Sequence, residues 1–96
     1  MNVEFSPEAL REFEDSALYY AECQPGLETR LVDCIEAAVR DIVDDPLRWR
    51  IFDGEVRRYL TAVFPFAVLY RVLDDRIVII AVMHCHRAPG YWRHRS

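Results

Sequence analysis

Two neighbouring segments near the end of the chain, residues 66–73 and 76–84, limit the folds that this sequence can adopt. Both are apolar at successive positions rather than at alternate ones, and only Asp74-Asp75 separates them. Strands that are apolar on both faces lie at the centre of a sheet whose two sides are both covered. The sequence therefore predicts a central antiparallel hairpin that needs a layer of other residues on each side.

One of these layers is predicted to be a pair of helices. Ser6-Pro7-Glu8 starts the first, with Ser at the N-cap, Pro at the first helical position and Glu near the positive end of the helix dipole. Pro25-Gly26 separates the two helices, and Asp44-Asp45-Pro46 ends the second. The apolar positions that recur at helical spacing are Leu10, Phe13, Ala17 and Tyr20 in the first helix and Leu27, Leu31, Ile35, Ala38 and Ile42 in the second.

The remaining segments complete an α+β pattern. Residues 3–5 are predicted to form a short first strand, and residues 55–63 a strand that follows the turn signal Asp53-Gly54. The predicted order is β-α-α-β-β-β, with the helix hairpin packed on one face of an antiparallel sheet and a short C-terminal tail. Since 96 residues can bury one modest core, residues 1–96 are predicted to form a single domain. Helices cover one face, so the other face requires the tail, a second subunit or a partner.

Charge is unevenly distributed along the chain. The net charge is −4, but residues 1–47 carry a net charge of −9 and residues 48–96 a net charge of +5. This asymmetry predicts an acidic half and a basic half that contacts a partner. The acidic average disfavours a simple nucleic-acid coat, and every basic residue is arginine, which recognises carboxylates and phosphates through two parallel hydrogen bonds.

The expected compartment is the cytoplasm, with no membrane partner. No apolar run approaches the ~20 residues that span a bilayer, and the first residues lack a basic segment followed by an apolar one. Cys23, Cys34 and Cys85 show no Cys-x-x-Cys spacing, which favours inert reduced thiols over a disulfide or metal framework.

Side chains that can perform chemistry gather at the end of the chain, where the last thirteen residues hold all three histidines. On a strand, His84 and His86 share a face. They could act as general acid and base in RNA cleavage. Arg87, Arg57 or Arg58 could then stabilise charge on the phosphate, and Tyr91 or Trp92 could stack on a base. Alternatively the two histidines could ligate zinc with His94, although this spacing matches no recognised signature, or make structural hydrogen bonds at the strand end.

A second candidate group contacts a target rather than performing chemistry. Arg57 and Arg58 are adjacent on a predicted strand, so their side chains should point to opposite faces. One is expected to face solvent or a partner, and the other to pair with an acid such as Glu55 or Asp74.

In the tail, Trp92 and Arg93 are the further predicted target contacts. The alternative is that Tyr91 and Trp92 pack on the core and that the tail simply caps the sheet. The sequence leaves both roles open.

Short motifs over almost the whole chain resemble the RelE/ParE toxin superfamily, and more narrowly its plasmid-stabilisation, ParE-like branch. They are Phe5-Ser6-Pro7-Glu8-Ala9, Tyr19-Tyr20, Pro25-Gly26-Leu27, Asp45-Pro46, Val56-Arg57-Arg58, Phe64-Pro65-Phe66, Leu69-Tyr70-Arg71 and Ala81-Val82-Met83-His84 with Arg87, Pro89, Tyr91 and Trp92. The order of elements in that superfamily agrees with the order expected from periodicity.

The resemblance implies the toxin of a type II toxin–antitoxin pair, neutralised by a cognate antitoxin that covers the sheet or the helix hairpin. ParE-like members inhibit DNA gyrase and have no established catalytic residues, whereas RelE-like members cut mRNA in the ribosome. The absence of lysine and the acidic net charge favour the ParE-like target. His84, His86, Arg87 and Tyr91 are catalytic candidates only if the chain is a nuclease. No cofactor or metal is implied, and a homodimer and a non-toxic interaction module remain open alternatives.

Overall fold

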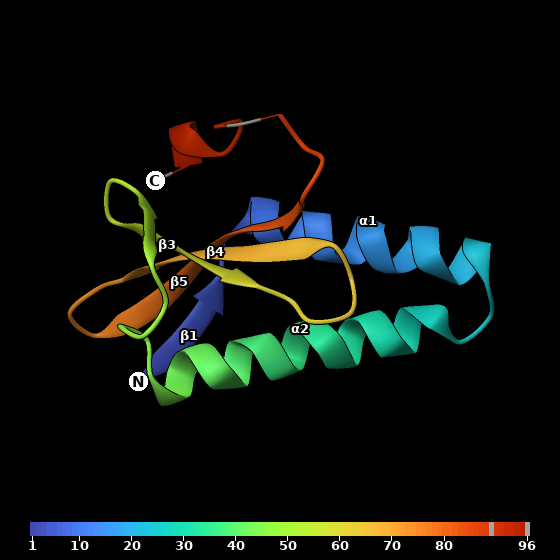
Figure 1. Ribbon diagram of the computed structural model, residues 1–96, viewed down its shortest axis with the longest axis horizontal. Helices are drawn as coiled ribbons and strands as arrows, with labels where there is room; N and C mark the ends of the chain where they lie inside the picture. The colour runs from blue at the N-terminus through green and yellow to red at the C-terminus, as the bar shows by residue number, and fades with distance from the viewer. Residues whose placement is uncertain (89, 96) are drawn as a thin grey trace.

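The computed structural model describes residues 1–88 and 90–95 as two helices on one face of a five-stranded sheet, with a C-terminal tail on the other face (Figure 1). Pro89, which belongs to one of the motifs above, lies outside the described residues. The predicted α+β class is confirmed. The elements are β1 (Asn2–Phe5), α1 (Pro7–Cys23), α2 (Leu27–Asp44), β2 (Ile51–Asp53), β3 (Val56–Leu60), β4 (Phe66–Val72), β5 (Arg76–His84) and the single 3₁₀ turn η1 (Arg93–Arg95).

The two helices begin and end close to the residues that the sequence marks as helix starts and breaks. The Ser6 side chain caps α1 by accepting a hydrogen bond from the backbone N–H of Ala9 at 3.1 Å, with Pro next in the chain. Gly26 has a φ of 88°, a left-handed conformation that favours glycine and lets the chain reverse before α2. One position was predicted wrongly, because Leu10 is exposed and the neighbouring Ala9 is buried in its place.

The sheet has the strand order β1-β5-β4-β3-β2, and the predicted central pair, β4 and β5, is in the middle. The strands from β2 to β5 run antiparallel to their neighbours, but β1 pairs with β5 in parallel. The short edge strand β2 adds one element to the predicted order. It pairs only with the first residues of β3, from Val56 to Arg57, and three residues are too few to show a periodic pattern.

The core has two layers, one on each face of the sheet. On the helix side, the predicted α2 positions Leu31, Ile35, Ala38 and Ile42 are buried against β4 and β5. On the opposite side, Trp92 of the tail is 1% exposed and packs in a second cluster with Val56, Ala67, Leu69, Ile80 and Ala81. The tail therefore supplies the second cover that the central strands require. None of the helices in the described residues is long and apolar enough to cross a membrane.

Candidate functional site

The tail is anchored to α1 through one half-buried carboxylate, Glu12. Its Oε2 accepts a hydrogen bond from the Tyr91 hydroxyl at 2.5 Å, and its Oε1 accepts from Nη1 of Arg95 at 2.9 Å. Oε1 also accepts from the backbone N–H of Val82 at 3.1 Å, on the edge of β5 that lies beyond the end of β1. Both side chains of the Glu12–Arg95 ion pair are largely buried, at 14% and 11% exposure, so solvent screens this pair less than a surface pair.

Tyr91 is enclosed by charged groups. The guanidinium carbons of Arg87 and Arg95 lie over its ring, at 4.1 and 5.1 Å from the ring centroid. Burial raises the pKa of the Tyr91 hydroxyl, and the hydrogen bond to Glu12 raises this pKa further. The phenol is therefore held protonated as a donor to Glu12, in the position of a tail anchor.

The two histidines predicted to act together do meet. Their ring centroids are 5.0 Å apart, and the ring of His84 also makes an edge contact with Phe66 at 5.3 Å. The backbone N–H of His86 donates to Nδ1 of His84 at 3.1 Å, so a neutral His84 ring carries its proton on Nε2. This leaves one nitrogen of His84 for contact with a ligand.

The adjacent arginines of β3 separate to opposite faces, as predicted. Arg57 donates to the carbonyl oxygens of Leu47 at 3.2 Å and of Trp49 at 2.7 Å, which ties down the loop before β2. Arg58 places its guanidinium carbon 4.4 Å from the centroid of the exposed Phe52 ring. The expected ion pair of one of them with Glu55 or Asp74 is wrong, because Glu55 pairs with Arg71 of β4 instead.

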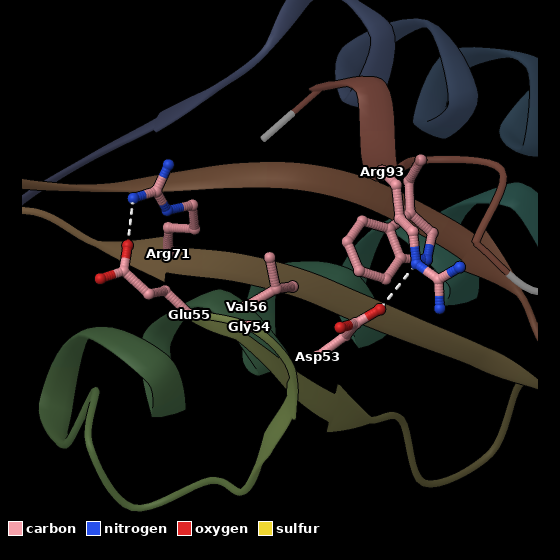
Figure 2. A pocket seen from close by; sticks show the side chains of 7 residues that line it. Asp53, Gly54, Glu55, Val56, Arg71 and Arg93 are labelled. Carbon is pink, nitrogen blue, oxygen red and sulfur yellow. Dashed lines mark hydrogen bonds and ion pairs between the residues drawn. The ribbon is translucent and has the colours of Figure 1, made fainter.

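A cavity of about 360 Å³ lies beside the β2–β3 turn, and Figure 2 shows two ion pairs at its margin. Arg71 pairs with Glu55, and Arg93 pairs with Asp53 at 2.7 Å, so the turn is bound to both β4 and the tail. The side chain of Arg93 remains 67% exposed. Trp92 also lines the cavity but belongs to the core. In this arrangement Arg93 is open to a target, whereas Trp92 supports the surface from beneath.

The residues that hold the tail carry no sequence signal. Glu12 stands among several acids on a helix, and Asp53 and Glu55 flank a turn glycine, so periodicity marks none of them as a partner for arginine. Across the described residues, no group of three or more His, Cys, Asp or Glu is placed to hold a metal ion, and Cys23, Cys34 and Cys85 are free thiols.

The family model for the ParE toxin of the type II toxin–antitoxin system parDE matches residues 3–89. The chain belongs to the ParE toxin family. Its fold is similar to that of a chain in the solved structure of the chromosomal ParDE TA system from P. aeruginosa, with a TM-score of 0.77 and 19% sequence identity. That similarity covers 88% of this chain and 95% of the other. No curated protein matches the chain.

The match to the ParE toxin family confirms the resemblance drawn from the motifs. The matched segment contains the helix hairpin, the whole sheet, His84, His86 and Arg87. Tyr91, Trp92 and the other tail residues beyond position 89 lie outside it.

Four arginines of the sheet and tail in this ParE-family chain are paired with neighbouring acids. Arg71, Arg76, Arg93 and Arg95 each form an ion pair. These four ion pairs reduce the cationic character of the basic half predicted from composition, which weakens its attraction for a polyanion.

Proposed function

We propose that this chain is the growth-arresting toxin of a type II toxin–antitoxin, plasmid-stabilisation module, that a cognate antitoxin neutralises it, and that it acts by binding DNA gyrase. The observation that carries the choice of a binding mode over catalysis is the state of Tyr91. Its hydroxyl donates to Glu12 and the guanidinium groups of Arg87 and Arg95 lie over its ring, so Tyr91 is poorly placed to stack on an RNA base, the role that the nuclease hypothesis gives it.

The charges of the tail support the same choice. A nuclease that acts on ribosome-bound mRNA gains most of its affinity from phosphate contacts. Here Arg95 is paired with Glu12 in a largely buried site and Arg93 with Asp53, so forming such contacts would require breaking existing pairs. Arg58 and Arg93, whose guanidinium groups lie toward the surface of the turn and tail, are the proposed target contacts.

The antitoxin is proposed to bind at the free edge of β3. The second half of β3 pairs with β4 on one side, but β2 does not reach it on the other, and Leu60 is 57% exposed there. Beside this edge is a largely apolar cavity of about 320 Å³ between β3 and α2, lined in part by Cys34, Tyr59 and Val63. An extended segment can add to such an edge through backbone hydrogen bonds while its side chains fill the adjacent cavity.

The test is induced expression of the chain in a bacterium, with transcript cleavage and gyrase supercoiling measured in parallel. Growth arrest with intact transcripts and blocked supercoiling is the expected result. Arrest with cut transcripts and normal supercoiling would instead favour a RelE-like ribosome-dependent nuclease, in which the contact between His84 and His86 provides the acid–base pair. Unimpaired growth would leave a non-toxic interaction module.

A further inference from the structure

A cleft beside the second half of α1 has a different chemistry from the turn and tail surface. It has a volume of about 490 Å³ and is lined by four aromatic rings, by Asp15 and by small or apolar side chains of both helices. We call it the α1 cleft. The four aromatic residues are Tyr19, Tyr20, Phe66 and His84.

The rings of the α1 cleft form a continuous series. The centroid of Tyr19 lies 5.4 Å from that of Tyr20, and Tyr20 lies 6.3 Å from Phe66. Phe66 in turn lies 5.3 Å from His84. A side-chain hydrogen bond with Cys23 raises the pKa of Tyr19, so this exposed phenol is neutral. Through Tyr19, Tyr20 and Phe66, the cleft therefore presents uncharged aromatic surface that is partly open to solvent.

The charge in the α1 cleft is negative. Asp15 is its one acidic lining residue, no arginine lines it, and within the described residues Asp15 makes no ion pair. Glu14 and Glu22 are exposed on the same helix and are likewise unpaired within the described part of the chain. A phosphate-bearing ligand would be repelled here, although aromatic rings could otherwise stack on bases.

We propose that the α1 cleft binds an arginine side chain presented by a partner protein. Aromatic rings beside a carboxylate attract a cation, because the ring faces carry negative charge and the carboxylate completes the neutralisation. Guanidinium suits the site better than ammonium, because it is planar, stacks on rings and is weakly hydrated. The antitoxin is the partner, and in that respect the inference rests on the proposed function.

In the α1 cleft, His84 has a binding role that needs no catalysis. His84 lies at the end of β5 with Nδ1 occupied by the backbone of His86, and its ring closes one side of the cleft. As a wall of an arginine site, His84 contributes ring surface and the orientation of Phe66. The predicted acid–base chemistry would require an RNA phosphate next to Asp15, which charge repulsion disfavours.

The direct test uses the purified chain and a small probe, N-acetyl-arginine methylamide, followed by NMR chemical shifts. Its neutral isostere, N-acetyl-citrulline methylamide, is the control for charge. We expect the largest shifts at the residues that line the cleft and at least about fivefold weaker binding of the citrulline probe. Equal binding of the two probes, or shifts scattered over the surface, would overturn the inference.

Variants locate the site. Asp15→Asn removes the carboxylate of the cleft, and Glu14→Gln is the matched control because Glu14 is also exposed on α1 but does not line the cleft. We expect Asp15→Asn to weaken binding of the arginine probe about fivefold and Glu14→Gln to leave it unchanged. Tyr19→Leu should weaken binding without unfolding, since Tyr19 is 62% exposed. Equal effects of Asp15→Asn and Glu14→Gln would contradict the assignment.

The probe experiment is independent of toxicity. A cleft that binds arginine in a chain without growth effect would support the site and refute the toxin proposal. Growth arrest by a chain whose cleft does not bind the probe would support the toxin proposal and refute the arginine site. In the complex with an antitoxin, Asp15→Asn should weaken association, and Glu14→Gln should not.

Discussion

Replacing Trp92 by alanine tests whether the tail is part of the core. Trp92 is 1% exposed, and its indole covers the tail-side cluster of small and branched apolar residues on β3, β4 and β5. Removing a buried tryptophan costs about 3–5 kcal/mol, through lost burial and the cavity that remains. Domains of this size have unfolding free energies of about 5–15 kcal/mol, so Trp92→Ala should remove a large fraction of the stability.

The measurement is the free energy of unfolding in urea for Trp92→Ala and for His94→Ala. His94 is an exposed residue of the same tail, so its replacement should change the stability by less than about 0.5 kcal/mol. A loss below about 1 kcal/mol for Trp92→Ala would refute the reasoning, because it would show that the sheet face does not depend on the tail for cover. In a Trp49→Phe background, Trp92 is the remaining tryptophan, and its fluorescence reports docking of the tail directly.

Three further predictions concern the contacts around the tail and the sheet. Glu12→Gln removes the charge that holds Tyr91 and Arg95, so the tail should detach more often. Trypsin should then cleave after the exposed Arg87 several-fold faster than it does in the control Glu14→Gln. Equal cleavage rates would argue against the anchor. Tyr91→Phe should cost about 1 kcal/mol in urea unfolding and preserve growth arrest, whereas lost arrest at unchanged stability would favour a nuclease. The hydrogen bond to Asp41 raises the pKa of Tyr59 to about 12 from its ordinary 10, so the free energy of unfolding should fall as the pH rises through this interval. Urea unfolding at several pH values should show a smaller fall for Tyr59→Phe. The same pH profile in both proteins would contradict this.

The parts of the fold that could be predicted are those that follow from the residue pattern of a single segment. Helix α2 buries four of the five apolar positions expected from its spacing and half-buries the fifth, Leu27, because a periodic apolar stripe leaves a helix one favourable face. The central strands β4 and β5 follow in the same way from apolar residues on both faces. The requirement for a second cover was also visible, although the sequence offered three sources for it.

The parts that could not be predicted depend on contacts between segments far apart in the chain. Glu12 and Tyr91 are separated by 79 positions, and nothing in either local sequence selects the other. Arg57 bonds to backbone carbonyls, which every residue has, so composition cannot identify its partners. The parallel pairing of β1 with β5 likewise arises from the path of the helix hairpin rather than from the residues of β1.

These buried contacts change how mutations of the tail must be interpreted. Trp92 and Arg93 are adjacent and were predicted together as target contacts, yet one is in the core and the other is exposed. A loss of growth arrest in Trp92→Ala could therefore follow from unfolding of the sheet face, whereas Arg93→Ala changes a side chain that is 67% exposed and whose ion pair with Asp53 is worth about 0–1 kcal/mol. Arg93 is for this reason the better probe of target binding. A stable Arg93→Ala variant that no longer arrests growth would assign the turn and tail surface to the target, and one that retains full activity would exclude the Arg93 side chain as an essential contact.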